Sequence, residues 1–347
     1  MTGLGRVCDK EVAFYRSVPK VHLHSHILGM VPPETFIELA EGYGVDLCGR
    51  TAADVYRYFD FTRLVGILSD VASVLRSEAD YSRVIYEIIG KAYREECVLY
   101  SELFVQTTYH LIYGTRYERM VDGFADGIER AERDFGVQTR LILGLNRQLP
   151  GPIASHIVRQ AIAYPSRHVI GIGLEDFEGF GPPEDFVEAY ALAGAAGLHR
   201  TAHAGEHGAA SNIMTSLTRL GCERIDHGYQ ATKEPTIAYR LADQQVHFTV
   251  CPTVASRQGW TRPDGNVLRT MRDYGFWMSI NSDDPEITGS NLNREYALAA
   301  KLMGAERREL VDISRASIAA TWLNDEEKRD LSHRFDSKLP PREGASA

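Results

Sequence analysis

Short, continuously apolar runs recur along this chain and alternate with longer segments in which apolar residues have helical spacing. Continuous runs are typical of parallel strands that are buried on both faces. The first strand is expected at residues 20–26, and the others at 98–105, 140–145, 169–174, 200–203, 224–227, 247–251 and 277–281. Helices are expected between them at 117–135, 153–163, 183–196, 210–220 and 235–243.

This alternation predicts the α/β class and, within it, a (β/α)8 TIM barrel that ends in C-terminal helices. A doubly wound open sheet is the alternative, but the Gly-rich turn with which such sheets bind dinucleotides is absent. Residues 1–347 are expected to form a single domain. Within it, residues 34–96 form a helical insertion after the first strand, and residues 336–347 form a frayed tail. The insertion is either a lid over a pocket or ordinary helix packing.

Composition narrows the functional class. The chain has 347 residues, of which 44% are hydrophobic and 24% charged, as in soluble globular proteins. A net charge of -9 argues against nucleic-acid binding, which needs a basic surface. No apolar run approaches membrane-spanning length, and the five cysteines form no CxxC pair. We therefore expect a cytoplasmic protein that binds neither membranes nor nucleic acid, and the oligomeric state stays open.

The first strand carries a run of histidines at alternate positions. Because successive side chains on a strand point to opposite faces, His22, His24 and His26 share one face. Two imidazoles separated by two positions can bind the same cation. An isolated HxH more often marks ordinary strand histidines, so the interpretation depends on the ends of later strands.

Further metal-ligand residues stand at those ends. His203 closes the expected fifth strand, and Asp283 follows the eighth. In a barrel these ends gather on one face, so His24, His26, His203 and Asp283 are expected to form a site for a catalytic divalent metal. Such a metal lowers the pKa of bound water and makes hydroxide available at neutral pH.

Two more residues are expected to move protons at this site. Glu206 follows His203 after a glycine that permits a sharp turn, which places it to exchange a proton with a substrate. His227, at the end of the sixth strand, is expected to orient the water together with Asp283. Partial burial of Glu206 is expected to raise its pKa and favour its use as an acid. Each residue alone also has an ordinary structural explanation; together, at four strand ends, they favour the metal site.

The motifs that carry this chemistry resemble those of the adenosine/adenine deaminase family of the amidohydrolase superfamily. They are Pro19-Lys20-Val21-His22-Leu23-His24-Ser25-His26, His203-Ala204-Gly205-Glu206, Asp226-His227-Gly228 and Ser279-Ile280-Asn281-Ser282-Asp283-Asp284-Pro285. The resemblance implies a zinc-dependent enzyme, with one Zn2+ per chain, that hydrolyses the 6-amino group of a purine. It implies that Glu206 protonates purine N1, that His227 lies beside the attacking hydroxide, and that Asp284 contacts N7. Iron and manganese also accept such ligands.

The residues expected to read the rest of the substrate depart from the family pattern. Adenosine deaminases usually carry an Asp that contacts ribose where this chain has Leu28, followed by Gly29. Glu175 and Asp176 replace the stretch in which nucleoside enzymes have a glycine at purine N3, and they resemble the adenine branch. The resemblance therefore implies an aminopurine substrate that is base-like or sugar-modified, with adenine, adenosine and a modified purine all open.

Two other classes of function compete with this interpretation. A metal hydroxide in such a barrel also serves esters or lactones, but Glu206 weighs against them because ester hydrolysis needs no acid aimed at a ring nitrogen. A non-catalytic ligand-binding relative would show decay of the ligand or acid positions, and none is seen.

Overall fold

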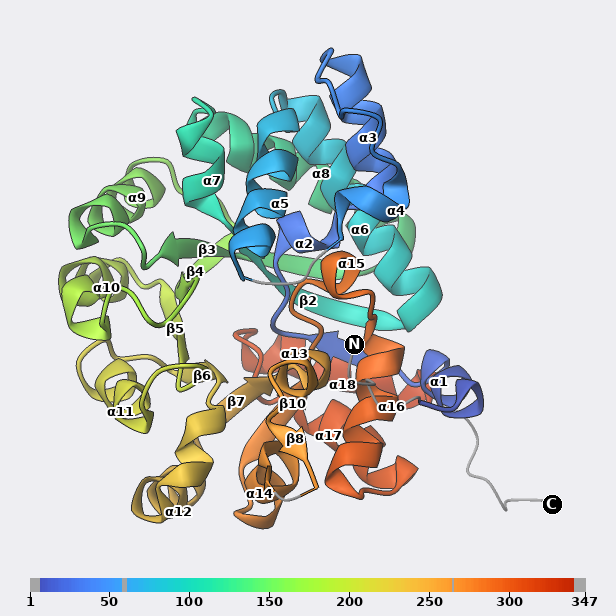
Figure 1. The fold of residues 1–347 in the computed structure, drawn as a ribbon, viewed down its shortest axis with the longest axis vertical. Helices are drawn as coiled ribbons and strands as arrows, with labels where there is room; N and C mark the ends of the chain where they lie inside the picture. The colour runs from blue at the N-terminus through green and yellow to red at the C-terminus, as the bar shows by residue number, and fades with distance from the viewer. Residues whose placement is uncertain (1–6, 58–60, 264, 340–347) are drawn as a thin grey trace.

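Eight parallel strands form the centre of the computed structural model, which describes residues 7–57, 61–263 and 265–339 (Figure 1). Within these residues the strands are hydrogen-bonded in chain order, with a helix-containing connection after each. They are β1 (Lys20–His22), β2 (Val98–Val105), β3 (Gln138–Asn146), β4 (Val169–Glu175), β5 (His199–Ala204), β6 (Arg224–His227), β7 (His247–Val250) and β10 (Trp277–Ile280). This order confirms the predicted (β/α)8 barrel.

The barrel closes where the first strand meets the last. Ser25 pairs with Asp283 in a parallel bridge just beyond both strands. β1 forms regular strand pairs over only three residues. Beyond them, the side chain of Asn281 accepts the hydrogen bonds that the backbone of a neighbouring strand would otherwise accept. Its Oδ1 accepts hydrogen bonds from the amides of Leu23 (2.8 Å) and His24 (3.1 Å). The segment that carries the first histidines is therefore fixed to the segment that carries Asp283.

Helices surround the strands as an outer layer (Figure 1). Their apolar faces pack onto the barrel, as in α8, whose buried residues recur at helical spacing. The outer helices are α1 (Asp9–Arg16), α6 (Glu78–Glu96), α8 (Tyr117–Phe135), α9 (Gly151–Ala163), α10 (Val187–Ala195), α11 (Ala210–Thr218), α12 (Pro235–Asp243), α14 (Val267–Asp273), α16 (Leu292–Met303), α17 (Arg307–Ala316) and α18 (Asp325–Lys338). A 3-10 turn, η1 (Pro183–Phe186), precedes α10, and another, η2 (Tyr229–Lys233), precedes α12.

Residues 34–96, expected as a helical insertion after the first strand, consist of helices joined by short turns and loops where the structure describes them. They include most of α3 (Pro33–Gly42), then α4 (Ala52–Val55), α5 (Phe61–Val74) and α6. The last of these packs against α8 and leads directly into β2, so it is the barrel helix of this connection. The additional helices are therefore α3 to α5. Residues 58–60 lie outside the described part of the chain.

Several short elements were not predicted from the sequence. A small helix, α2 (Ile27–Met30), occupies the segment expected to be a loop. The others are α7 (Thr107–Ile112), α13 (Pro252–Arg257), α15 (Pro285–Thr288) and the hairpin of β8 (Thr261–Arg262) with β9 (Gly265–Asn266). At the C-terminus, α18 extends into the segment expected to fray, and residues 340–347 lie outside the description. No helix among the described residues is long and apolar enough to cross a membrane.

Candidate active site

A cavity opens at the C-terminal ends of the strands, where TIM barrels place their active sites. It encloses about 670 Å³ of empty space, a figure that includes the part open to solvent. Residues from five strand ends line it: His26, Glu175, Asp176, His203, Glu206, His207, His227, Asp283 and Asp284. Its outer wall consists of Leu64, Leu68, Val254, Gln258 and Thr288.

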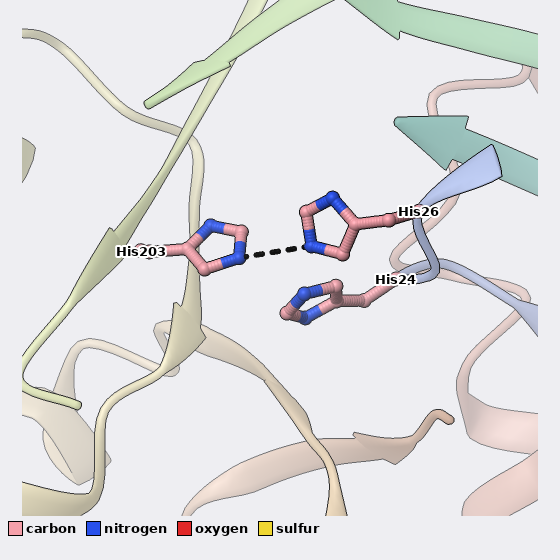
Figure 2. A group of neighbouring side chains, drawn as sticks. All are labelled: His24, His26 and His203. Atoms are coloured by element: carbon pink, nitrogen blue, oxygen red, sulfur yellow. Dashed lines mark hydrogen bonds between the residues drawn. The ribbon is translucent and has the colours of Figure 1, made fainter. Parts of the chain in front are cut away.

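Three imidazoles meet at the base of this cavity. His24, His26 and His203 offer nitrogens that all lie within 4.8 Å of one another. Figure 2 shows His203 facing His24 and His26, which follow β1, with 3.2 Å between Nε2 of His203 and Nε2 of His26. Oδ1 of Asp283 lies 3.3 Å from Nε2 of His26 and 3.9 Å from Nε2 of His24. The structure thus brings together all four residues expected to bind a metal.

The chemistry of this cluster fits a divalent cation. Nε2 of His24 is buried and has no hydrogen-bond partner among the described residues, which is costly unless something else binds it. Burial also lowers the pKa of His24 well below its usual value, so its ring is neutral, as a metal ligand must be. Burial opposes protonation of His26 too, but Glu175, Asp284 and Asp283 raise its pKa to about 10. The three carboxylates therefore favour a positive charge beside His26.

Hydrogen bonds behind the imidazoles set their orientation. Thr249 Oγ1 donates to Asp226 Oδ1 (2.8 Å), so it accepts from Nδ1 of His24 (2.9 Å). The proton of His24 is therefore on Nδ1, and the lone pair of Nε2 points to the cluster. The other carboxylate oxygen of Asp226 lies 3.5 Å from Nδ1 of His203. Such partners behind metal ligands orient the rings and raise their basicity.

Glu175 has the same relationship to His26. Its carboxylate Oε2 lies 3.2 Å from Nδ1 of His26, and the side chain is buried. Glu175 was expected to contact the substrate, and this stays a prediction. The residue lines the cavity, and its carboxylate is directed at a predicted metal ligand.

His22, in contrast, lies outside the cluster. Its Nε2 is hydrogen-bonded to Ser282 Oγ at 3.0 Å, and the residue is buried. It therefore holds β1 against the segment after β10.

Glu206 and His227 face each other across the cavity. Oε2 of Glu206 lies 3.8 Å from Nε2 of His227 and 3.2 Å from Nδ1 of His207. Burial raises the pKa of Glu206, but His227, His207 and His203 outweigh burial and lower this pKa to about 2. The expectation of a raised pKa is therefore wrong. Burial is present, but the surrounding imidazoles keep the carboxyl ionised.

His227 also approaches the metal cluster. Its Nε2 lies 3.7 Å from Oδ2 of Asp283. Asp176, His227 and Asp283 all have positive φ angles (72°, 67° and 61°), a conformation that residues other than glycine rarely adopt. Backbone strain of this kind is concentrated at functional sites, because the surrounding structure must enforce it. Three of the six non-glycine residues with positive φ in the described part of the chain therefore lie in this site.

Asp284 and Asp176 each have a carboxyl oxygen without a partner in the described part of the chain. Oδ1 of Asp284 and Oδ2 of Asp176 are buried and make no hydrogen bond within the described protein. The other oxygen of Asp176 accepts from the hydroxyl of Tyr109 at 2.9 Å. Burial raises the pKa of Asp284 to about 8, and a protonated carboxyl can donate a hydrogen bond as well as accept one. Gly29 lies against Asp284 and leaves room for its side chain.

Leu28 does not lie at the substrate-binding position that the family resemblance implied. Its side chain is completely buried in the hydrophobic core and is not among the residues that line the cavity. Its amide donates to Oε1 of Gln106 at 3.0 Å. The expectation that Leu28 occupies a substrate-binding position is corrected, because the α2 turn directs this side chain into the core.

Sequence analysis missed most of the outer wall and the partners behind the ligands. Leu64 and Leu68 come from α5 in the segment expected as an insertion, which gives no motif by which to recognise them. Asp226 was part of the Asp226-His227-Gly228 motif but was given no role. Its position at a strand end, next to His227, could have indicated one. Thr249 has no comparable signal, since its role depends on contacts between strands.

The fold and this site define a metal-dependent hydrolase of the barrel type. The sequence matches the adenosine deaminase family model over residues 19–338. An adenine deaminase from Aspergillus fumigatus is 34% identical over 342 residues, covering 94% of this chain and 96% of that protein. The chain therefore belongs to the adenosine deaminase family.

Solved structures agree with this assignment. The adenine deaminase from Arthrobacter aurescens superposes with a TM-score of 0.86 at 29% identity, covering 92% of this chain and 98% of that one. An amidohydrolase from Burkholderia ambifaria with bound zinc has a TM-score of 0.85 at 30% identity, covering 97% and 95% of the two chains.

Proposed function

We propose that this protein hydrolyses the 6-amino group of an adenine-type purine and releases ammonia. The observation that carries the proposal is a cavity that Glu206 lines together with predicted metal ligands, and in which the Glu206 carboxylate lies 3.8 Å from Nε2 of His227. Family membership supports the reaction, and the relatives named adenine deaminases support a purine base as substrate.

His24, His26, His203 and Asp283 would hold one zinc ion per chain. The unpartnered Nε2 of His24 and the short distances among the four side chains support this assignment. The zinc in the Burkholderia ambifaria structure supports the choice of metal. When bound, such a metal activates water as a nucleophile and polarises the reacting centre.

Hydrolysis replaces the C6–N bond by a C6–O bond, and water supplies two protons. One proton goes to ring N1, and the other leaves with ammonia. Glu206, ionised at rest, would take the first proton and give it to N1, which withdraws electrons from C6. His227 and Asp283, whose side chains are 3.7 Å apart, would orient the water and carry the second proton to the amine.

Asp284 and Asp176 would contact the purine itself. The unpartnered Oδ1 of Asp284 would face N7, as the family resemblance implies. The unpartnered Oδ2 of Asp176 would accept from a ring N–H, which a purine without a 9-substituent offers. These contacts favour a free base or a compact analogue over a nucleoside.

The test is ammonia release by the zinc-loaded protein from adenine, adenosine, N6-substituted adenines and 5′-modified adenosines, with a phenyl ester in parallel. Ammonia from a 6-aminopurine would support the proposal, and the kcat/KM ranking would identify the substrate. Cleavage of the ester without release of ammonia from any purine would contradict the proposal and indicate a hydrolase of another bond. Purine binding without turnover would indicate a non-catalytic relative.

A further inference from the structure

A buried carboxylate lies behind the turn that carries Glu206. Glu178 follows β4 by three residues, and it is not among the residues that line the cavity. Its two oxygens accept hydrogen bonds from four consecutive backbone amides and from one side-chain amide. The donors are Gly205 N (2.8 Å), Glu206 N (2.9 Å), His207 N (3.1 Å), Gly208 N (2.8 Å) and Asn212 Nδ2 (2.9 Å).

This arrangement more than fills the accepting capacity of one carboxylate, because five donors meet it and three of them share Oε2. An ionised carboxylate offers about four lone-pair sites, and hydrogen bonds to charged acceptors are stronger than those to neutral ones. The turn is shaped to fit it: a Cβ at Gly208 would lie 2.6 Å from Cδ of Glu178. Because four consecutive amides of this turn donate to one carboxylate, that carboxylate determines the conformation of the turn.

The carbonyl side of the same turn is also held. Nε2 of Gln230 donates to the carbonyl oxygen of Glu206 at 2.7 Å, and its backbone amide donates to the carbonyl oxygen of Gly205 at 2.7 Å. The buried Arg147 donates to the carbonyl oxygen of His203, at the start of the turn. The backbone of Glu206 is therefore fixed on both sides, and Glu178 supplies most of the bonds.

We infer that Glu178 is a positioning residue that aims the Glu206 carboxylate at the substrate. This inference rests on the proposed function for its kinetic consequence, but its structural basis does not. Glu178 acts through the backbone, so its loss should move Glu206 while leaving the metal cluster intact. A displacement of about 1 Å in a catalytic group can cost on the order of a hundredfold in rate.

The decisive variant is Glu178→Gln, which keeps the shape of the side chain. Its NH2 group would face amide donors, so part of the hydrogen bonds must break. We expect kcat to fall about tenfold to a hundredfold, with KM changed by less than about threefold and zinc content unchanged. Glu188→Gln, an exposed change in α10, is the matched control and should keep wild-type kinetics.

A double-mutant cycle separates positioning from general destabilisation. If Glu178 acts through Glu206, the variant that combines Glu178→Gln with Glu206→Gln should be hardly slower than Glu206→Gln alone. If the losses in kcat of the two single variants instead multiply in the double variant, Glu178 affects the rate by a route that does not include Glu206, and the inference is overturned. Glu178→Asp, which keeps the charge, should retain more activity than Glu178→Gln.

Hydrogen exchange tests the inference without any activity. In the wild-type protein the amides of residues 205–208 should exchange slowly, and in Glu178→Gln at least tenfold faster, with the amides of β2 unchanged as a reference. Fast exchange at residues 205–208 in the wild type would refute the arrangement even if no variant folds. If no aminopurine releases ammonia but this exchange pattern holds, the proposed function fails and the positioning role stands.

Discussion

Gly29 lies so close to Asp284 that a methyl group on its Cα would overlap the Oδ1 oxygen of that carboxyl. The short helix after the first strand and the segment after the last strand are thus fitted to each other at the cavity wall. Because this oxygen has no partner in the described protein, its position is set by shape rather than by hydrogen bonding. Only glycine leaves room for it.

Gly29→Ala should therefore displace Asp284 and lower kcat/KM by about tenfold to a hundredfold, the scale of a catalytic-site misplacement. Gly42→Ala is the control, because a Cβ there would meet nothing within 4 Å. Steady-state kinetics on both variants, with zinc content measured in each, checks the prediction. Wild-type kinetics in Gly29→Ala would show that Asp284 is not a substrate contact.

Removing a metal ligand should empty the site. His24→Ala and Asp283→Ala should each lower zinc content to a small fraction of one ion per chain, because the remaining ligands form a weaker site. His22→Gln is the discriminating control. His22 shares the histidine run but bonds to Ser282, so this variant should keep its zinc. Elemental analysis that finds full occupancy in His24→Ala would disprove the ligand assignment.

Glu206→Gln should retain the fold and the zinc but lose at least about a hundredfold in kcat, the scale of a missing general acid or base. Glutamine keeps the shape of the side chain but cannot carry a proton to N1. Ammonia release at saturating substrate measures the loss. Equal rates in variant and wild type would require another residue to protonate the ring.

The sequence was sufficient to predict those residues of the site whose positions follow from the order of the strands along the chain. Parallel strands in a barrel bring their carboxyl ends to one face, so His203 and Asp283 could be placed beside His24 and His26 from the pattern alone. Each of these residues lies in a strand or within four residues of its end, which places its side chain at this face of the barrel.

Other features depend on contacts that no local pattern encodes. The low pKa of Glu206 arises from His207 and His227, and the second of these is contributed by the next strand. Leu28 was misplaced because a short helix, rather than a loop, follows the first strand and directs this side chain into the core. The bonds of Glu178 to the turn at Glu206 could not be predicted either, since they connect two separate loops.

Asp226 offers a test of the hydrogen bonds behind the ligands. Asp226→Asn removes the charge that faces His203 and reaches His24 through Thr249. Zinc affinity should fall about tenfold to a hundredfold, as is typical when such partners are changed. Asp243→Asn, at an exposed position in α12, is the control. Competition with a zinc chelator measures both affinities, and equal values would mean that Asp226 does not support the ligands.

Leu28→Asp distinguishes a core position from a substrate contact. In the core, the new carboxylate would be buried without a partner, which costs about 3 kcal/mol or more of unfolding free energy. Leu28→Met, which nearly conserves volume, should cost about 1.5 kcal/mol or less. Denaturant unfolding measures both. The ratio of kcat/KM for adenosine to that for adenine should not change in the folded fraction, because this side chain does not line the cavity. A Leu28→Asp variant with wild-type stability and a gain in adenosine turnover would show instead that position 28 reads the sugar.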